Sequence, residues 1–197
     1  MNTPSHAILN LALISQQSPI QASLPIAIGA ILPDAPIFIL YFWAKFVLRQ
    51  PERQIWLETY EQPFWQNWVA MFHSLPLALI GVAIAYFLNW QSVEILFMSM
   101  VLHSLFDLPV HNHDAHRHFF PFSNYRFISP FSYWDTKHYG GVVSVIEKIL
   151  VLGATIYLFP AITSWVGKGL MIGVNLFYWT IFLYFRVIKP QLYTKTG

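Results

Sequence analysis

The chain has 197 residues, of which 56% are hydrophobic, 18% aromatic and 10% charged. A soluble globular domain carries about 25% charged residues, so this composition excludes an ordinary soluble domain and predicts one membrane-embedded helical domain over residues 1–197. The absence of cysteine excludes disulfide frameworks, thiolate metal sites and cysteine nucleophiles. The formal net charge of +2 is too small to indicate nucleic-acid binding, and the partner that we expect is the lipid bilayer.

The sequence of residues 1–48 predicts short helices rather than one continuous transmembrane helix. The letters TPS at residues 3–5 stand ahead of an apolar run and predict a helix over 5–14. A helix of that length cannot cross a bilayer, which needs about 20 residues. Residues 16–19 then predict a turn.

Residues 20–48 are apolar but interrupted by prolines, and Asp34 lies inside the sequence PDAP. We expect a helix over 20–32, a break over 33–36 and a second helix from 37 onward. The sequence leaves open whether this segment crosses the membrane or folds back at PDAP. The predicted fold is therefore an all-α polytopic bundle whose N-terminal helices are short and broken or re-entrant.

The rest of the chain alternates long apolar runs with polar segments. Tryptophan and tyrosine among the polar residues of 45–68 predict a segment at the membrane interface. The runs that predict transmembrane helices are 69–90, 93–109, 142–160 and 169–188. Between the second and the third lies a long histidine-rich and aromatic loop over 110–141, which we expect at the interface.

Basic residues indicate the orientation of these spans. They gather in three groups separated by pairs of spans: Lys45, Arg49 and Arg53; Arg117, Arg126 and Lys137; Arg186, Lys189 and Lys195. The turn that joins the spans 69–90 and 93–109 holds no basic residue. Because cytoplasmic loops are rich in lysine and arginine, the long loop and the C-terminus are predicted in the cytoplasm of a bacterial-type inner membrane.

This orientation places several potential metal ligands at one depth. His103 and Asp107 are four residues apart near the end of a predicted span, so their side chains point the same way. His73 begins a span that leaves the same membrane face. If the segment with PDAP folds back, Asp34 and His6 can join them. Neutral imidazole with carboxylate suits a divalent ion, zinc first, with manganese or iron as alternatives.

Each of these residues also has a structural interpretation. His103 and Asp107 could share a simple hydrogen bond, and Asp34 could cap a helix N-terminus. His6 and His73 could be ordinary interfacial histidines. An ionisable residue at the end of a membrane span nevertheless indicates a functional site by default.

The loop offers more candidates than one site can use. The stretch from His103 to His138 holds six of the eight histidines and three of the four aspartates. His113 and His116 are the preferred ligands among the tandem histidines, and we expect a role for His138 as well. The alternative is a loose, adventitious metal patch.

The loop also supplies candidates for catalysis. Asp114 or Asp135 could act as general base, and Arg126 could bind an anionic leaving group through its planar fork of donors. Contact of Arg126 with a lipid headgroup is the alternative for that residue.

Several motifs in order resemble a known family. They are PSHAILN, GAILPDAP, FHSLPLAL, LHSLFDLP and PFSNYRFISPFSYWDTKHYG, and together they resemble the YdjM-like family of membrane-bound metal-dependent hydrolases over about residues 3–140. The resemblance implies that the His, PD, HS and HxxxD elements bind metal, which carries over to His6, Asp34, His73, His103 and Asp107. The family often has a basic residue and a threonine ahead of its HS element, where this chain has VAMF.

The order of ligands is also similar, more loosely, to that of zinc-dependent phospholipase C. That enzyme uses an N-terminal tryptophan as a ligand, where this chain has Met1. The likeness implies a phosphoester substrate.

The function that we expect is a membrane-bound hydrolase with one or two divalent ions, acting on a lipid or lipid-linked phosphoester at the cytoplasmic interface. A divalent-metal transporter or sensor, and a structural membrane protein with an incidental histidine loop, are the alternatives. A transporter would need polar residues through the bundle, and the spans 69–90 and 169–188 offer almost none beyond their ends.

Overall fold

The computed structural model describes residues 1–15 and 23–185, and in this part of the chain all regular secondary structure is helical. Several expectations lie outside the described residues: the turn at 16–19, the first residues of the 20–32 helix, the end of the 169–188 span, and Arg186, Lys189 and Lys195. The remaining expectations can be compared with the structure.

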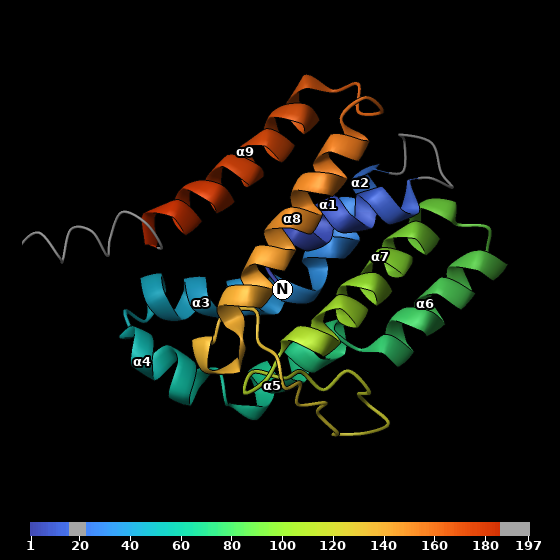
Figure 1. The fold of residues 1–197 in the computed structure, drawn as a ribbon. Helices are drawn as coiled ribbons and strands as arrows, with labels where there is room; N and C mark the ends of the chain where they lie inside the picture. Colours follow the sequence, from blue (N-terminus) through green and yellow to red (C-terminus); the bar gives the residue numbers. More distant parts are fainter. Residues whose placement is uncertain (16–22, 186–197) are drawn as a thin grey trace, which may run out of the picture.

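The helices follow one another along the chain as Figure 1 shows. They are α1 (Thr3–Ile14), α2 (Ser23–Ile31), α3 (Ala35–Phe42), α4 (Glu52–Gln54), α5 (Pro63–Phe72), α6 (Leu75–Phe87), α7 (Gln91–Asp107), α8 (Gly140–Leu158) and α9 (Trp165–Leu183). Residues 111–135 form turns and bends without a helix. The predicted all-helical class is confirmed for the described residues.

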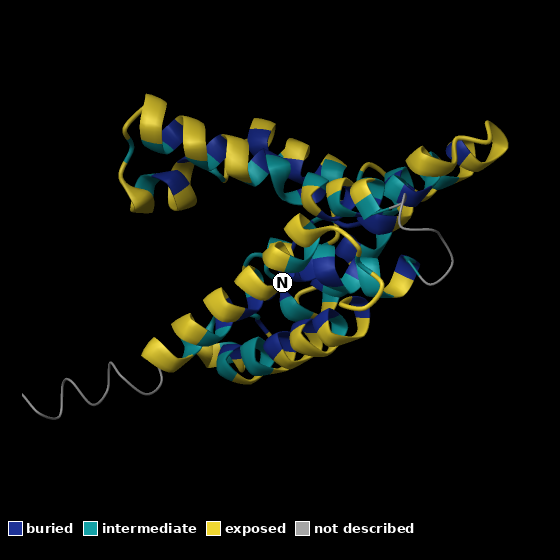
Figure 2. Ribbon diagram, turned by 90° about the horizontal axis from the view of Figure 1, so that it is seen from above, coloured by how far each residue is buried: buried dark blue, intermediate teal, exposed yellow. Residues whose placement is uncertain are grey.

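Four helical stretches are long and apolar enough to cross a membrane: Ser23–Val47, Gln91–Val110, Gly140–Leu158 and Trp165–Leu183. The pair α5 and α6 would form a fifth, bent by 45°. Large apolar side chains such as Phe87, Ile156 and Trp165 are exposed, and exposed residues cover the outer faces of the long helices (Figure 2). Such surfaces suit hydrocarbon rather than water, which is the expected character of an integral membrane protein.

The segment 20–48 differs from its prediction. The expected break over 33–36 is only a 3₁₀ turn over Leu32–Asp34, and the helix then continues through α3 and a π turn to Val47 without folding back. The prolines cause little disruption because Pro33 and Pro36 each lie in the first turn of the element that they enter, where the missing N–H is not needed.

The prediction of a single transmembrane helix over residues 69–90 was wrong. It is interrupted at His73–Ser74, between α5 and α6. Pro76 lies in the first turn of α6, and the Ser74 Oγ accepts a hydrogen bond from the Leu77 N–H at 3.2 Å. A proline excludes a continuous helix through the preceding turn, whereas serine is a favoured N-cap. The interruption leaves His73 at a helix end, beside the loop.

α9 also begins earlier than the predicted start at residue 169. Its first residue is Trp165, and the Ser164 Oγ caps it by accepting a hydrogen bond from the Gly167 N–H at 3.3 Å. The cap residue was visible in the sequence, but the apolar run alone does not mark it.

α1 lies in the middle of the molecule, between α8 on one side and α2 and α7 on the other (Figure 1). Ile8 of α1 packs in a core cluster with Val151 and Leu158 of α8, and Ile14 packs with Ile26 and Ile95. This position buries the polar face of α1, including His6, at the ends of the helices that carry the other candidate ligands.

Candidate metal centre

Buried imidazoles and carboxylates from separate segments converge near the C-terminal end of α7. They come from α1, from the 3₁₀ turn after α2, from the α5–α6 break, from α7 and from the loop. They form three overlapping groups whose potential ligand atoms lie within 4.8 Å of one another: His6, His103 and Asp107; Asp34, His73 and His103; His73, Asp107 and His116. The structure thus brings together six of the residues that the sequence predicts as ligands.

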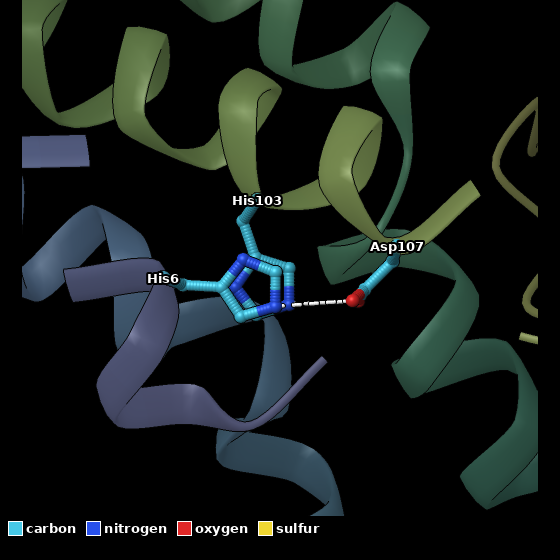
Figure 3. Close-up of side chains that lie close together, drawn as sticks. All are labelled: His6, His103 and Asp107. Carbon is cyan, nitrogen blue, oxygen red and sulfur yellow. Dashed lines mark hydrogen bonds and ion pairs between the residues drawn. The ribbon is translucent and has the colours of Figure 1, made fainter. Parts of the chain in front are cut away.

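Asp107 lies at the centre of these groups. Its Oδ1 is 3.0 Å from His6 Nε2, and its Oδ2 is 3.1 Å from His103 Nε2. The rings of His6 and His103 stack with centroids 3.7 Å apart, and both point toward the Asp107 carboxylate (Figure 3). Asp107 is 1% exposed and the two histidines are 0% exposed, so water cannot reach this carboxylate freely.

Backbone carbonyls fix the tautomers of two histidines. His73 Nδ1 donates to the Val69 carbonyl at 2.9 Å, and His103 Nδ1 donates to the Ala30 carbonyl at 2.7 Å. Because a carbonyl only accepts, each Nδ1 carries a proton, and in the neutral imidazole the Nε2 then presents a lone pair. Both Nε2 atoms are buried without a hydrogen-bond partner.

These lone pairs point at carboxylate oxygens. The Nε2 atoms of His73 and His103 lie 3.5 and 3.7 Å from Asp34 Oδ1. A lone pair that faces an anionic oxygen is repelled unless a cation lies between them. The donor set therefore fits a cation with nitrogen and oxygen ligands, and the carbonyl partners provide the outer support that metal-binding histidines usually have.

Asp34 is not used as a helix cap. It occupies the residue before α3, but its side chain makes no capping hydrogen bond. Its Oδ2 accepts a hydrogen bond from the Thr3 hydroxyl instead, and its Oδ1 faces the histidines. Asp34 therefore does not cap the N-terminus of α3, which was the structural alternative for this residue.

The chain's first residue and His111 extend the cluster. The Met1 α-amino group donates to Asp107 Oδ1 at 2.7 Å and lies 3.0 Å from His111 Nε2. His111 Nδ1 in turn donates to Asp114 Oδ2 at 3.0 Å, and the Trp134 indole N–H donates to the same oxygen at 3.0 Å. Asp114 Oδ1 is buried and has no hydrogen-bond partner.

A cavity of about 290 Å³ opens over this cluster. Its lining includes Asp34, His111, Asp114 and His116, with the aromatic side chains Tyr60 and Tyr133. A small molecule in this cavity would lie beside both the candidate ligands and Asp114.

Burial favours the neutral imidazole at three histidines of this region, whereas the Asp107 carboxylate outweighs burial at His111 and raises its pKa. Burial lowers the pKa of His6 to about 4 and the pKa of His118 to about 4. Burial, with the nearby His73, lowers the pKa of His116 well below its usual value. Neutral imidazole is the state that binds a metal ion.

Other predicted residues lie elsewhere. His113 and His138 do not join the buried groups; with Asp135 they form a separate, more exposed group, in which His138 Nδ1 donates to Asp135 Oδ2 at 2.8 Å. Of the three loop histidines preferred as ligands, His116 therefore lies in the buried cluster and His113 and His138 lie outside it. Arg126 donates from Nη2 to Gln66 Oε1 at 2.9 Å and does not line the cavity.

His111 was not among the preferred ligands predicted from the sequence. A signal was present, because His111 follows Asp107 by four residues just as Asp107 follows His103. Pro109 suggests that the helix ends before His111, yet a 3₁₀ turn over Leu108–Val110 carries the chain far enough to bring His111 Nε2 within 3.3 Å of Asp107 Oδ1.

These features define an all-helical protein with membrane-length apolar helices and a buried histidine–aspartate cluster. No family model, curated protein or solved structure matches the chain. The resemblance to the YdjM-like family stays a prediction.

Proposed function

We propose that the protein is a membrane-bound, metal-dependent hydrolase that acts on a lipid or lipid-linked phosphoester at the cytoplasmic face of the membrane. One observation carries the proposal: the buried Nε2 atoms of His73 and His103 have no hydrogen-bond partner, and their lone pairs point at the carboxylates of Asp34 and Asp107. Burying this set without a cation would cost free energy, because unpaired polar groups lose their hydration.

The donors favour zinc, with manganese or iron as alternatives. Imidazole and carboxylate are the usual ligands of catalytic zinc, and the chain has no thiolate to offer. The overlapping groups share Asp107, His73 and His103, which suits one or two ions. A divalent ion supplies Lewis acidity and lowers the pKa of a bound water to about 7.

Asp114 is the residue best placed to act as general base. Asp114 lines the cavity, its Oδ2 accepts hydrogen bonds from His111 and Trp134, and its buried Oδ1 has no hydrogen-bond partner. Although burial favours the neutral acid, the hydrogen bond from His111 lowers the pKa of Asp114. The carboxylate is therefore ionised and able to accept a proton from a nucleophile.

Metal content of purified protein tests the proposal. The protein is extracted in a mild detergent, and bound metals are measured by elemental analysis for the wild type, His103→Ala and Asp107→Asn. We expect one or two equivalents of a transition metal in the wild type and loss of most of it in both variants. His113→Ala is the matched control and should leave the metal of the buried cluster in place, because His113 belongs to the separate loop group.

Undiminished metal in both His103→Ala and Asp107→Asn would end the proposal. Turnover distinguishes the enzyme from the alternatives. Metal-dependent hydrolysis of a panel of phosphoesters and lipids supports it, whereas metal uptake into vesicles without turnover would assign the cluster to a transporter.

A further inference from the structure

A second and larger cavity lies between α8 and α9. Its volume is about 670 Å³, within the range of pockets that enclose small ligands. Phe177, Ile181, Phe182 and Phe185 of the α9 side form an apolar wall. Such a wall offers little to a polar ligand and suits a hydrocarbon chain.

Among the described residues that line this cavity, one carries an ammonium group. Lys148 of α8 lines the cavity and is 8% exposed. Its Nζ donates to the carbonyl and the hydroxyl oxygen of Ser144 and lies 5.7 and 5.8 Å from the ring centres of Tyr178 and Phe182. Among residues 1–15 and 23–185, no carboxylate forms an ion pair with it.

The neighbouring carboxylate, that of Glu147, forms no ion pair with this ammonium group. Glu147 faces α1, where its Oε1 accepts hydrogen bonds from the Asn2 N–H at 2.9 Å and from the Ser5 hydroxyl at 2.5 Å. A buried cation in a candidate membrane span is costly without an anionic partner, and such residues usually mark a ligand site. Lys148 is thus available to an anion that enters the cavity.

The large cavity adjoins the one over the candidate metal centre. Asn2 and Tyr133 line both, and Met1, next to Asn2, contacts Asp107. A ligand in the large cavity would therefore lie beside Asn2 and Tyr133, which also line the cavity over the histidine–aspartate cluster. The two cavities together offer an apolar part, an ammonium group and a set of metal ligands.

We propose that the α8–α9 cavity holds the hydrocarbon chain of an anionic amphiphile and that Lys148 binds its anionic group. In that arrangement the amphiphile is the substrate of the hydrolase, an inference that rests on the proposed function. Lys148 is a binding residue for this ligand and takes no part in the metal centre.

Binding of dodecyl phosphate to metal-free protein tests this inference separately from catalysis. The protein is stripped with a chelator, placed in phosphatidylcholine nanodiscs and titrated with radiolabelled dodecyl phosphate. We expect saturable binding by the wild type. Lys148→Met should lose affinity by at least about tenfold, because it removes a charge-assisted hydrogen bond, which is roughly twice as strong as a neutral one. Lys148→Arg retains the positive charge and should bind with an affinity close to wild type.

Lys168→Met is the matched control. Lys168 also lies over aromatic rings, those of Phe159 and Trp165, but near the opposite end of α8 and away from the cavity. Its removal should leave binding unchanged. An equal loss in Lys168→Met would show that the probe responds only to membrane surface charge and would overturn the inference.

Two further outcomes would also overturn it. One is unchanged affinity in Lys148→Met. The other is displacement of dodecyl phosphate by an equal concentration of inorganic phosphate, which would mean that the hydrocarbon chain contributes nothing to binding. Metal content separates this inference from the proposed function. If Lys148→Met keeps its metal and still binds dodecyl phosphate with wild-type affinity, the substrate site is refuted and the proposed hydrolase is not.

Discussion

Two aspartates of the loop have the same local relation to a histidine but different surroundings. Asp114 pairs with His111 and Asp135 pairs with His138, each across three residues. Only Asp114 lines the cavity over the buried cluster. The sequence offered both as general bases, and the cavity distinguishes between them.

Replacement of these two aspartates should therefore have different effects. We expect Asp114→Asn to lower kcat by about 10²-fold or more, because general-base catalysis contributes about 10²–10⁴. Metal content should be retained, since the amide oxygen of asparagine can still accept the hydrogen bonds from His111 and Trp134. The measurement is steady-state hydrolysis of a phosphoester together with elemental analysis.

Asp135→Asn is the control for this experiment and should keep wild-type turnover. If Asp114→Asn loses its metal as well as its activity, Asp114 acts by positioning His111 rather than as a base. Equal losses of activity in the two variants would contradict the assignment of the base to the cavity.

Part of the cluster could be predicted from the residues alone. His103 and Asp107 share a helix face by their spacing, and the order of apolar runs predicts that His73 returns to the same level. The choice among His113, His116 and His118 could not be predicted, because a segment without helix or strand has no periodicity that fixes the direction of a side chain. Whether the converged residues bind metal stays a prediction.

At the scale of helices, α2 and α7 approach so closely that a glycine is needed. A Cβ added to Gly29 would meet the Leu96 carbonyl oxygen at 2.2 Å, a backbone atom that cannot turn aside. α2 also provides the Ala30 carbonyl that holds His103 and leads directly into Asp34. The packing of these two helices therefore sets the geometry of the cluster.

Gly29→Ala should accordingly destabilise the protein and weaken metal binding. We expect the free energy of unfolding to fall by about 1–3 kcal/mol, the usual cost of overpacking, and a larger fraction of metal to be removed by a fixed chelator concentration. Thermal unfolding in detergent and a chelator titration measure the two effects.

Gly153→Ala provides the comparison, because nothing lies within 4 Å of an added Cβ there. It should leave metal binding unchanged and alter stability by at most about 1 kcal/mol, in the direction of greater helix propensity. A Gly29→Ala protein that unfolds like the wild type would contradict the close approach of α2 and α7.

The helices show which sequence signals were decisive. The positions of α7 and α8 followed from long apolar runs, since a membrane-length run allows few alternatives. The break at His73–Ser74 was not predicted because the apolar run hides it, although Pro76 and Ser74 are an ordinary helix start. The prolines of PDAP, by contrast, suggested a break in the helix, but the structure has only a single 3₁₀ turn there.

For the whole molecule, the decisive question is which side of the membrane the cluster faces. The long loop follows Gln91–Val110 and the α6–α7 turn precedes it, so this 20-residue helix separates the two. At about 1.5 Å per residue such a helix is about 30 Å long, the thickness of the hydrocarbon core. The loop holds Arg117, Arg126 and Lys137, whereas the turn holds no basic residue.

The positive-inside rule therefore predicts opposite labelling of two exposed serines. Because the chain has no cysteine, single cysteines introduced by Ser92→Cys and Ser123→Cys can be labelled without background; both serines are exposed, in the first turn of α7 and in the loop respectively. In spheroplasts of a bacterial host, a membrane-impermeant maleimide should label the cysteine at 92 at once and the cysteine at 123 only after permeabilisation. Inside-out vesicles should give the reverse pattern. The opposite result would place the histidine–aspartate cluster on the outer face, where only substrates of the outer leaflet could reach it. The cytoplasmic orientation would then be wrong, whether or not the cluster binds metal.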